Sequence, residues 1–79
     1  MTVLLFARLR EIVGEGRVEL ELPLGATAGA AFSALAAVAP GLGATRSRVR
    51  CAVGEEYATW DTVLVDGAEL ALIPPTAGG

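Results

Sequence analysis

The spacing of hydrophobic positions changes several times along the chain, and each change marks an expected element. The apolar run Thr2–Ala7 predicts a strand with little exposure on either face. Residues 8–13 place apolar side chains at helical spacing before Gly14, which predicts one short helical turn. Arg17–Leu22 alternates between polar and apolar residues, which predicts a half-buried strand antiparallel to the first.

The middle of the chain predicts the main helix. Thr27 is a suitable N-cap, and the residues from there to about Ala39 are mostly strong helix formers. One stripe with the helical period carries the apolar side chains Ala28, Phe32, Leu35 and either Val38 or Ala39. Pro40 and Gly41 end this helix, and Gly41–Ser47 is expected to be a loop.

The second half of the chain predicts three further strands. They are Val49–Val53, a short strand over Tyr57–Trp60, and Glu69–Ile73. Turns are expected at residues 54–56 and at Asp66-Gly67. The last strand should stop at Pro74 and Pro75, because proline cannot donate to a strand ladder.

This order of elements predicts an α+β fold. One main helix on one face of a mixed sheet buries both apolar surfaces. If the first two strands form a hairpin and the helix crosses to a strand parallel to the first, the result is a β-grasp (ubiquitin-like) roll, which the right-handed crossover rule permits. We expect one domain over residues 1–73, followed by a flexible tail over residues 74–79.

Composition excludes most chemistry within the chain. The 79 residues include no His, no Lys and one Cys, so a His/Cys zinc site, a Ser-His-Asp or Cys-His mechanism and a Schiff-base lysine are all excluded. We therefore expect no metal and no cofactor bound by this chain. The net charge of −3 disfavours nucleic acid, and no apolar run approaches the about 20 residues of a membrane span. A cytoplasmic protein is expected.

The ending of the sequence is its most unusual feature. Two glycines at a chain end can simply be a frayed terminus. Here, however, the last strand leads directly into Pro74-Pro75, which keeps the departing chain extended, and six residues can reach about 20 Å. Gly78 and Gly79 carry no Cβ, so a nucleotide or a sulfur atom could approach the terminal carboxylate freely. The backbone terminus would then be the reactive group.

Motifs at both ends resemble one family. Residues 6–11, Phe-Ala-Arg-Leu-Arg-Glu, and residues 64–79, with Pro-Pro-x-x-Gly-Gly intact, are similar to the MoaD/ThiS family of ubiquitin-like sulfur carriers, and in particular to its molybdopterin synthase branch. The likeness spans the whole chain, with Val53 matching its middle. Ala68 departs from the family's acidic turn, and Gly54 stands where Asn is frequent.

The resemblance implies a function in molybdenum cofactor biosynthesis. An E1-like enzyme would adenylate the Gly79 carboxylate with ATP, and a persulfide sulfur donor would convert it to a thiocarboxylate. The tail would then enter the large subunit of molybdopterin synthase, in an implied heterotetramer, and donate sulfur to a cyclic pterin phosphate. The isolated chain would catalyse nothing. Gly78 gives access to Gly79, and the implied partner contacts are Phe6, Tyr57, Ile73, Pro74, Pro75, Thr76 and Ala77.

Three other functions remain open from the sequence. Carriers for thiamine thiazole, tRNA thiolation or cysteine synthesis share the fold and the tail. A protein modifier conjugated to lysines is a second possibility, and an interaction module with an inert tail is a third. The double proline and the opening motif favour the molybdopterin branch.

Several side chains have a structural and a functional interpretation. Cys51 in an apolar strand is expected to be a small buried residue and not a nucleophile. The single helix covers one sheet face only, so apolar residues on the other face would mark a partner site, although Phe6 alone fits the core equally well. Arg46, Arg48 and Arg50 form at most a weak phosphate patch. Trp60 is expected to pack at the core or its rim.

Overall fold

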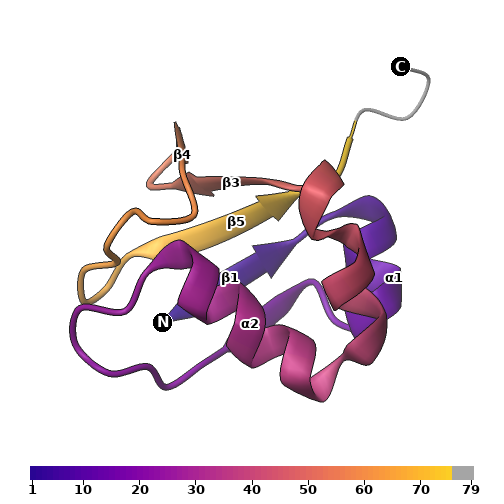
Figure 1. Cartoon of the computed structure of the whole chain (residues 1–79), viewed down its shortest axis with the longest axis horizontal. Coiled ribbons are helices and arrows are strands. Elements are labelled where there is room, and N and C mark those ends of the chain that lie inside the picture. The colour runs from indigo at the N-terminus through magenta and orange to yellow at the C-terminus, as the bar shows by residue number, and fades with distance from the viewer. Residues whose placement is uncertain (76–79) are drawn as a thin grey trace.

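The computed structural model describes residues 1–75 of the chain. Two helices, one 3₁₀ helix and five strands follow one another in the order β1, α1, β2, α2, η1, β3, β4, β5 (Figure 1). Their bounds are β1 Thr2–Leu5, α1 Ala7–Val13, β2 Arg17–Glu19, α2 Ala28–Val38, η1 Pro40–Arg48, β3 Arg50–Val53, β4 Glu56–Ala58 and β5 Glu69–Ile73.

The five strands form one mixed sheet in the order β2-β1-β5-β3-β4. β1 pairs with β2 in antiparallel fashion and with β5 in parallel, and β3 is antiparallel to both β4 and β5. The chain therefore makes a hairpin, crosses over through α2 and returns to the centre of the sheet. This is the predicted β-grasp topology, and the prediction is confirmed.

The helix α2 covers one face of this sheet (Figure 1). Thr27 caps it as predicted, since its Oγ1 accepts a hydrogen bond of 3.1 Å from the Ala30 backbone N–H. The buried side of α2 meets the inward residues of β1 and β5, and the core contains Val3, Leu5, Ala28, Phe32, Leu35, Leu70 and Leu72. The sequence left Val38 and Ala39 as alternatives, and the structure buries Ala39 and exposes Val38.

The loop expected at Gly41–Ser47 is wrong, because this segment lies within the 3₁₀ helix η1. The sequence of η1 has no helical periodicity of apolar residues that would have predicted it. It is held by tertiary packing of the fully buried Leu42 and by a hydrogen bond of 2.6 Å from Thr45 Oγ1 to the Leu42 carbonyl. Gly41 permits a close approach to α1, since a Cβ there would lie 3.2 Å from Ile12 Cγ2.

Four strands are shorter than, or displaced from, their predicted bounds. β3 begins at Arg50, one residue after its predicted start, because Arg50 lies opposite Ile73, the last residue of β5. β2 stops at Glu19, which lies opposite Thr2, the first residue of β1. β4 begins at Glu56 and stops at Ala58, which lies opposite Cys51. β1 stops at Leu5 because Phe6 is the N-cap of α1. The predicted helical turn before Gly14 and the last strand, Glu69–Ile73, are confirmed.

Within residues 1–75, no helix has both the length and the apolar character needed to cross a lipid bilayer.

Candidate functional site

The tail that carries the predicted reactive Gly79 follows directly after β5, the central strand of the sheet. β5 lies between β1 and β3, and its residues Leu70 and Leu72 are completely buried. Pro74, which is half-buried, and Pro75, which is exposed, follow directly after Ile73. The strand that leads into the two prolines is thus paired on both sides and anchored by two buried leucines, which fixes the direction in which the chain leaves the sheet.

Four of the predicted site residues lie outside the described residues. These are the predicted reactive Gly79, its neighbour Gly78, and the expected partner contacts Thr76 and Ala77.

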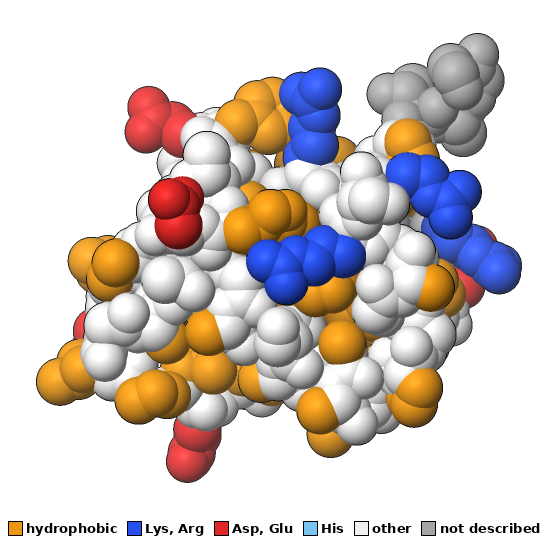
Figure 2. All heavy atoms as spheres, in the orientation of Figure 1, with side chains coloured by type: hydrophobic (Ala, Val, Ile, Leu, Met, Phe, Trp, Pro, Cys, Tyr) orange, Lys and Arg blue, Asp and Glu red, His pale blue; other side chains and the backbone are white. Residues whose placement is uncertain are grey.

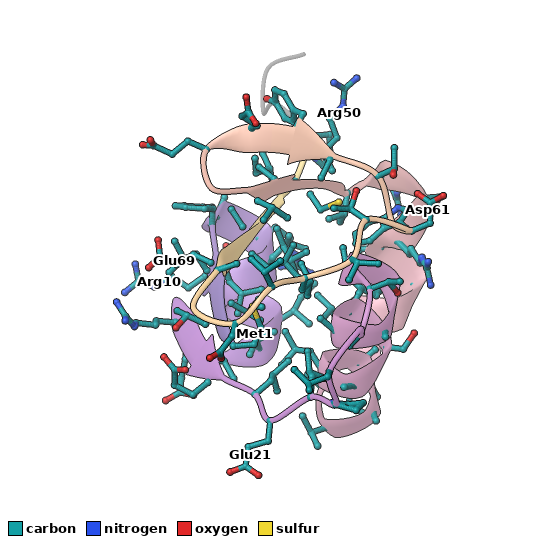
Figure 3. All side chains as sticks on the ribbon, turned by 90° about the vertical axis from the view of Figure 1, so that its left-hand side faces the viewer. Met1, Arg10, Glu21, Arg50, Asp61 and Glu69 are labelled. Atoms are coloured by element: carbon teal, nitrogen blue, oxygen red, sulfur yellow. The ribbon has the colours of Figure 1, made fainter. Side chains whose placement is uncertain are left out.

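The sheet has an open face, on the side away from α2. Side chains of directly paired residues point to the same face, and the pairs Leu4↔Ala71, Ala71↔Ala52 and Ala52↔Tyr57 make a row across four strands. In Figure 3 the labelled Glu69, which shares this face with Ala71, lies on the side opposite α2. The row is apolar from Leu4 to the ring of Tyr57.

A second row lies nearer to the tail. Leu5 pairs with Leu72 in parallel register, which brings Phe6 to the level of Ile73, and Ile73 lies opposite Arg50. Phe6 and Tyr57 are 47% and 69% exposed, whereas Ile73 is half-buried. We name Phe6, Tyr57, Ile73 and Arg50 the tail-side face. The structure thus places the three predicted contact residues on one surface beside the exit of the chain, and the interpretation of Phe6 as a core residue is wrong.

Arg50 is a member of the tail-side face, although the sequence named it only as part of a weak phosphate patch and not as a partner contact. Its guanidinium carbon lies 5.7 Å from the centroid of the Tyr57 ring, over which it stacks. Figure 3 shows Arg50 extending outward from the sheet. The period of two along β3 could have revealed this position, because Arg50 and Ala52 share a face.

Cys51 is buried, as predicted. It is 2% exposed, and its Sγ donates a hydrogen bond of 3.4 Å to the Ala58 carbonyl. Burial raises the pKa of the Cys51 thiol, and this effect outweighs the opposing effects of a backbone hydrogen bond and of the charge on Arg46. A neutral, enclosed thiol is a poor nucleophile.

Arg46, Arg48 and Arg50 do not form one phosphate patch. Arg46 stacks on aromatic rings, with its guanidinium carbon 5.0 Å from the centroid of Trp60 and 5.7 Å from that of Phe32. Trp60 in turn meets Phe32 edge-on at 5.2 Å, which confirms that it packs at the rim of the core. Arg48 lines a groove beside Pro74 and Pro75, and this groove was not predicted from the sequence.

Comparison with known proteins agrees with this fold. The model of the ThiS family matches residues 3–79. The molybdopterin synthase sulfur carrier subunit of Arabidopsis thaliana is 42% identical over 77 residues, which cover 98% of this chain and 80% of that protein.

Two solved structures are also similar. SAMP1 from Haloferax volcanii, a small archaeal modifier protein, superimposes with a TM-score of 0.87 at 31% identity and covers 99% of this chain and 97% of its own. A chain of the Amycolatopsis orientalis BexX/CysO complex has a TM-score of 0.79 at 25% identity. The match covers 99% of the present chain and 98% of that chain. Because the family model matches almost the whole sequence, and the fold and tail motif agree with it, the chain belongs to the ThiS family.

Proposed function

We propose that this chain is the sulfur carrier subunit of a molybdopterin synthase and that the carboxylate of Gly79 is the group that carries the sulfur. The observation that carries the proposal is the direct passage from the central strand β5 into Pro74-Pro75 beside an open apolar face, in a chain that ends in Gly-Gly. The 42% identity to a molybdopterin synthase sulfur carrier subunit supports the same branch.

The chemistry needs an activated carboxylate. An E1-like partner joins the Gly79 carboxylate to the AMP part of ATP and releases pyrophosphate. The terminal sulfur of a persulfide then attacks the carbonyl, AMP leaves, and a thiol cleaves the sulfur–sulfur bond to leave a thiocarboxylate and a disulfide. The thiocarboxylate is a good sulfur nucleophile near neutral pH. The proposal leaves acid–base catalysis and phosphate binding to the partners, which agrees with a chain that contains no His and no Lys.

We assign the tail-side face to the large synthase subunit, with Pro74, Pro75, Thr76 and Ala77 entering the partner along with Gly78 and Gly79. An exposed apolar patch next to a reactive group is a suitable docking surface, because burying Phe6, Tyr57 and Ile73 would hold the tail in the partner's active site. A heterotetramer with the large subunit and a cytoplasmic location are part of this proposal.

Intact mass measurement tests the proposal. The purified chain is incubated with the E1-like enzyme, ATP and a persulfide source, and it should gain the mass difference between sulfur and oxygen. A chain that lacks Gly79 is the matched control and should gain nothing. An unchanged mass of the full chain would contradict the proposal.

A second candidate function is protein modification. The structural similarity to SAMP1, at a TM-score of 0.87, favours it. In that case the activated Gly79 would form amide bonds with amines of other proteins, and adducts of higher mass would appear in cell extracts supplied with ATP. The absence of Lys in this chain would prevent lysine-linked chains built on it.

A further inference from the structure

The junction between β1 and α1 contains a residue with a left-handed φ that is not glycine. Ala7 has a φ of 47°, and within residues 1–75 Glu55 is the only other non-glycine residue with a positive φ. The backbone N–H of Leu9 donates a hydrogen bond of 3.0 Å to the Phe6 carbonyl, which closes a turn with Ala7 at its first central position. A positive φ at that position alone is the pattern of a type II′ turn, in which glycine is the residue without strain.

The methyl group of Ala7 destabilises the free chain and gains nothing there. A Cβ at a positive φ crowds the backbone, and glycine would avoid this. Ala7 is exposed, and among the described residues it neither belongs to the core nor packs against it. Strained backbone of this kind gathers at functional sites. We therefore expect the contact that offsets the strain to lie outside the free chain.

The position of Ala7 indicates where this contact lies. Its neighbour Phe6 belongs to the tail-side face, and Ala7 itself lines the same groove as Pro74 and Pro75. The parallel pair Leu5↔Leu72 brings the two chain segments side by side just before this point. Figure 1 shows α1 beginning close to the end of β5, where the chain leaves the sheet. Ala7 thus joins the tail-side face to the root of the tail.

The surface around the root of the tail suits an apolar contact. On the face shown in Figure 2, hydrophobic side chains reach the place where the chain leaves the sheet, and the charged side chains beside them are mainly basic. Phe6 is 47% exposed and Pro75 is exposed as well. A methyl group between such neighbours is removed from water when a partner closes over them, and this burial stabilises the complex.

We propose that the Cβ of Ala7 is a contact atom for the large synthase subunit and that it joins Phe6, Pro74 and Pro75 into one apolar strip. The inference rests on the proposed function, because it takes the large subunit as the partner of the tail-side face. The surface that covers the strip is apolar and fits closely, since a methyl group offers no hydrogen bond and a small apolar area. The energy of this contact offsets the strain at Ala7 in the complex.

Glu55 provides the matched control, because it has the same backbone feature at a different place. It follows Gly54 in the turn between β3 and β4, and both residues have a positive φ. Its side chain is exposed, and it does not line the groove beside the prolines. Glu55→Gly therefore relieves a left-handed residue without removing any atom from the apolar strip.

The test measures stability and affinity on the same variants. The melting temperature is recorded for the wild type, Ala7→Gly, Ala7→Asn and Glu55→Gly, and calorimetric titration gives the affinity of each for the purified large synthase subunit. Ile73→Asp is included as a variant in which the tail-side face itself is disrupted. Asn tolerates a left-handed φ, so Ala7→Asn keeps a Cβ and the turn but places a polar amide in the strip.

We expect Ala7→Gly to raise the melting temperature by up to about 8 °C and to weaken binding about fourfold, which corresponds to one buried methyl group. Ala7→Asn should retain the stability of the wild type and weaken binding about tenfold, because its amide would be buried without a partner. Glu55→Gly should raise the melting temperature and leave the affinity unchanged. Opposite changes of stability and affinity at Ala7 are not expected of a residue with a purely structural role.

Three results would overturn the inference. If Ala7→Gly binds like the wild type while Ile73→Asp loses affinity, Ala7 is not a contact and the proposed function stands. If Ala7→Gly weakens binding and Ala7→Asn restores it, the backbone of Ala7 and not its methyl group matters. If the wild type neither gains sulfur nor binds the large subunit, the proposed function fails and the assignment of Ala7 fails with it.

Discussion

The guanidinium group of Arg46 lies over the indole ring of Trp60, with its carbon 5.0 Å from the ring centroid. The same arginine reaches the Phe32 ring at 5.7 Å, so one exposed cation covers the aromatic rim of the core. It also ties η1 to α2, because a Cβ at Gly29 of α2 would lie 3.0 Å from an Arg46 nitrogen. Arg46 therefore contributes to the fold through its stacked position on these rings.

Replacing Arg46 should lower stability. Arg46→Ala removes a cation–π contact worth about 1 kcal/mol together with the packing of the side-chain stem. For a domain of this size the melting temperature should fall by about 4–8 °C per kcal/mol. Thermal unfolding followed by fluorescence is a direct measurement, because Trp60 is the only tryptophan. Arg48→Ala, which breaks no stacking contact, is the control, and equal melting temperatures for the two variants would contradict the prediction.

The turn between β3 and β4 carries a strained residue. Gly54 and Glu55 have φ angles of 59° and 71°, and Val53 pairs with Glu56 across them, which is the pattern of a type I′ hairpin turn. A left-handed conformation costs a residue with a Cβ about 1–2 kcal/mol, so Glu55→Gly should raise the free energy of unfolding by up to about 1 kcal/mol. Chemical denaturation measures it. The same change at Glu56, a strand position, should destabilise the protein instead, and the opposite order of the two variants would contradict this account.

The tail-side face offers a test of synthase docking. Ile73→Asp introduces a charge into the apolar part of this face, at a half-buried position opposite Arg50. A buried interface residue of this kind contributes about 2 kcal/mol or more, so binding to the large subunit should weaken by about thirtyfold or more. Calorimetric titration measures the affinity. Val38→Asp is the control, since Val38 is 77% exposed on α2 and lies away from this face. Equal affinities for the two variants would exclude the tail-side face as the docking surface.

Local patterns in the sequence were sufficient to predict most of the helices and strands and their arrangement. The alternation in β2, the stripe on α2 and the Thr27 cap each depend on neighbouring residues, and each was predicted. The end of β2 at Glu19 depends instead on where β1 begins, and η1 depends on a pocket for Leu42 that other elements provide. Such boundaries are set by tertiary contacts, so a local pattern does not contain them.

In the candidate site, too, local motifs predicted some residues, whereas others are brought together only by tertiary packing. Gly79 follows from the motif alone, and Phe6, Tyr57 and Ile73 follow from the family likeness together with the alternation of strands. The groove joins residues of α1 with residues of η1 and with the two prolines. Because η1 was expected to be a loop, nothing in the sequence placed Arg48 in the same groove as Arg8.

Cys51 gives a prediction for alkaline pH. Burial raises the pKa of its thiol, so the folded chain holds this proton more tightly than the unfolded chain does. The stabilisation is fully present below the pKa of the unfolded thiol, about 8.5, and it is lost as the pH rises through the folded pKa. The free energy of unfolding of the wild type should therefore fall above about pH 8.5, and part of this fall should be absent in Cys51→Ala.

Denaturation of both proteins over that pH range measures the effect, and the difference between the two curves isolates Cys51 from every other titrating group. The same enclosed thiol should react with iodoacetamide far more slowly in the folded chain than in the denatured chain, since its Sγ is buried and hydrogen-bonded to Ala58. Sulfur loading of Cys51→Ala should match that of the wild type. Complete loss of loading in a folded Cys51→Ala variant would show that the thiol takes part in the chemistry, and parallel pH curves would show that burial leaves its pKa unchanged.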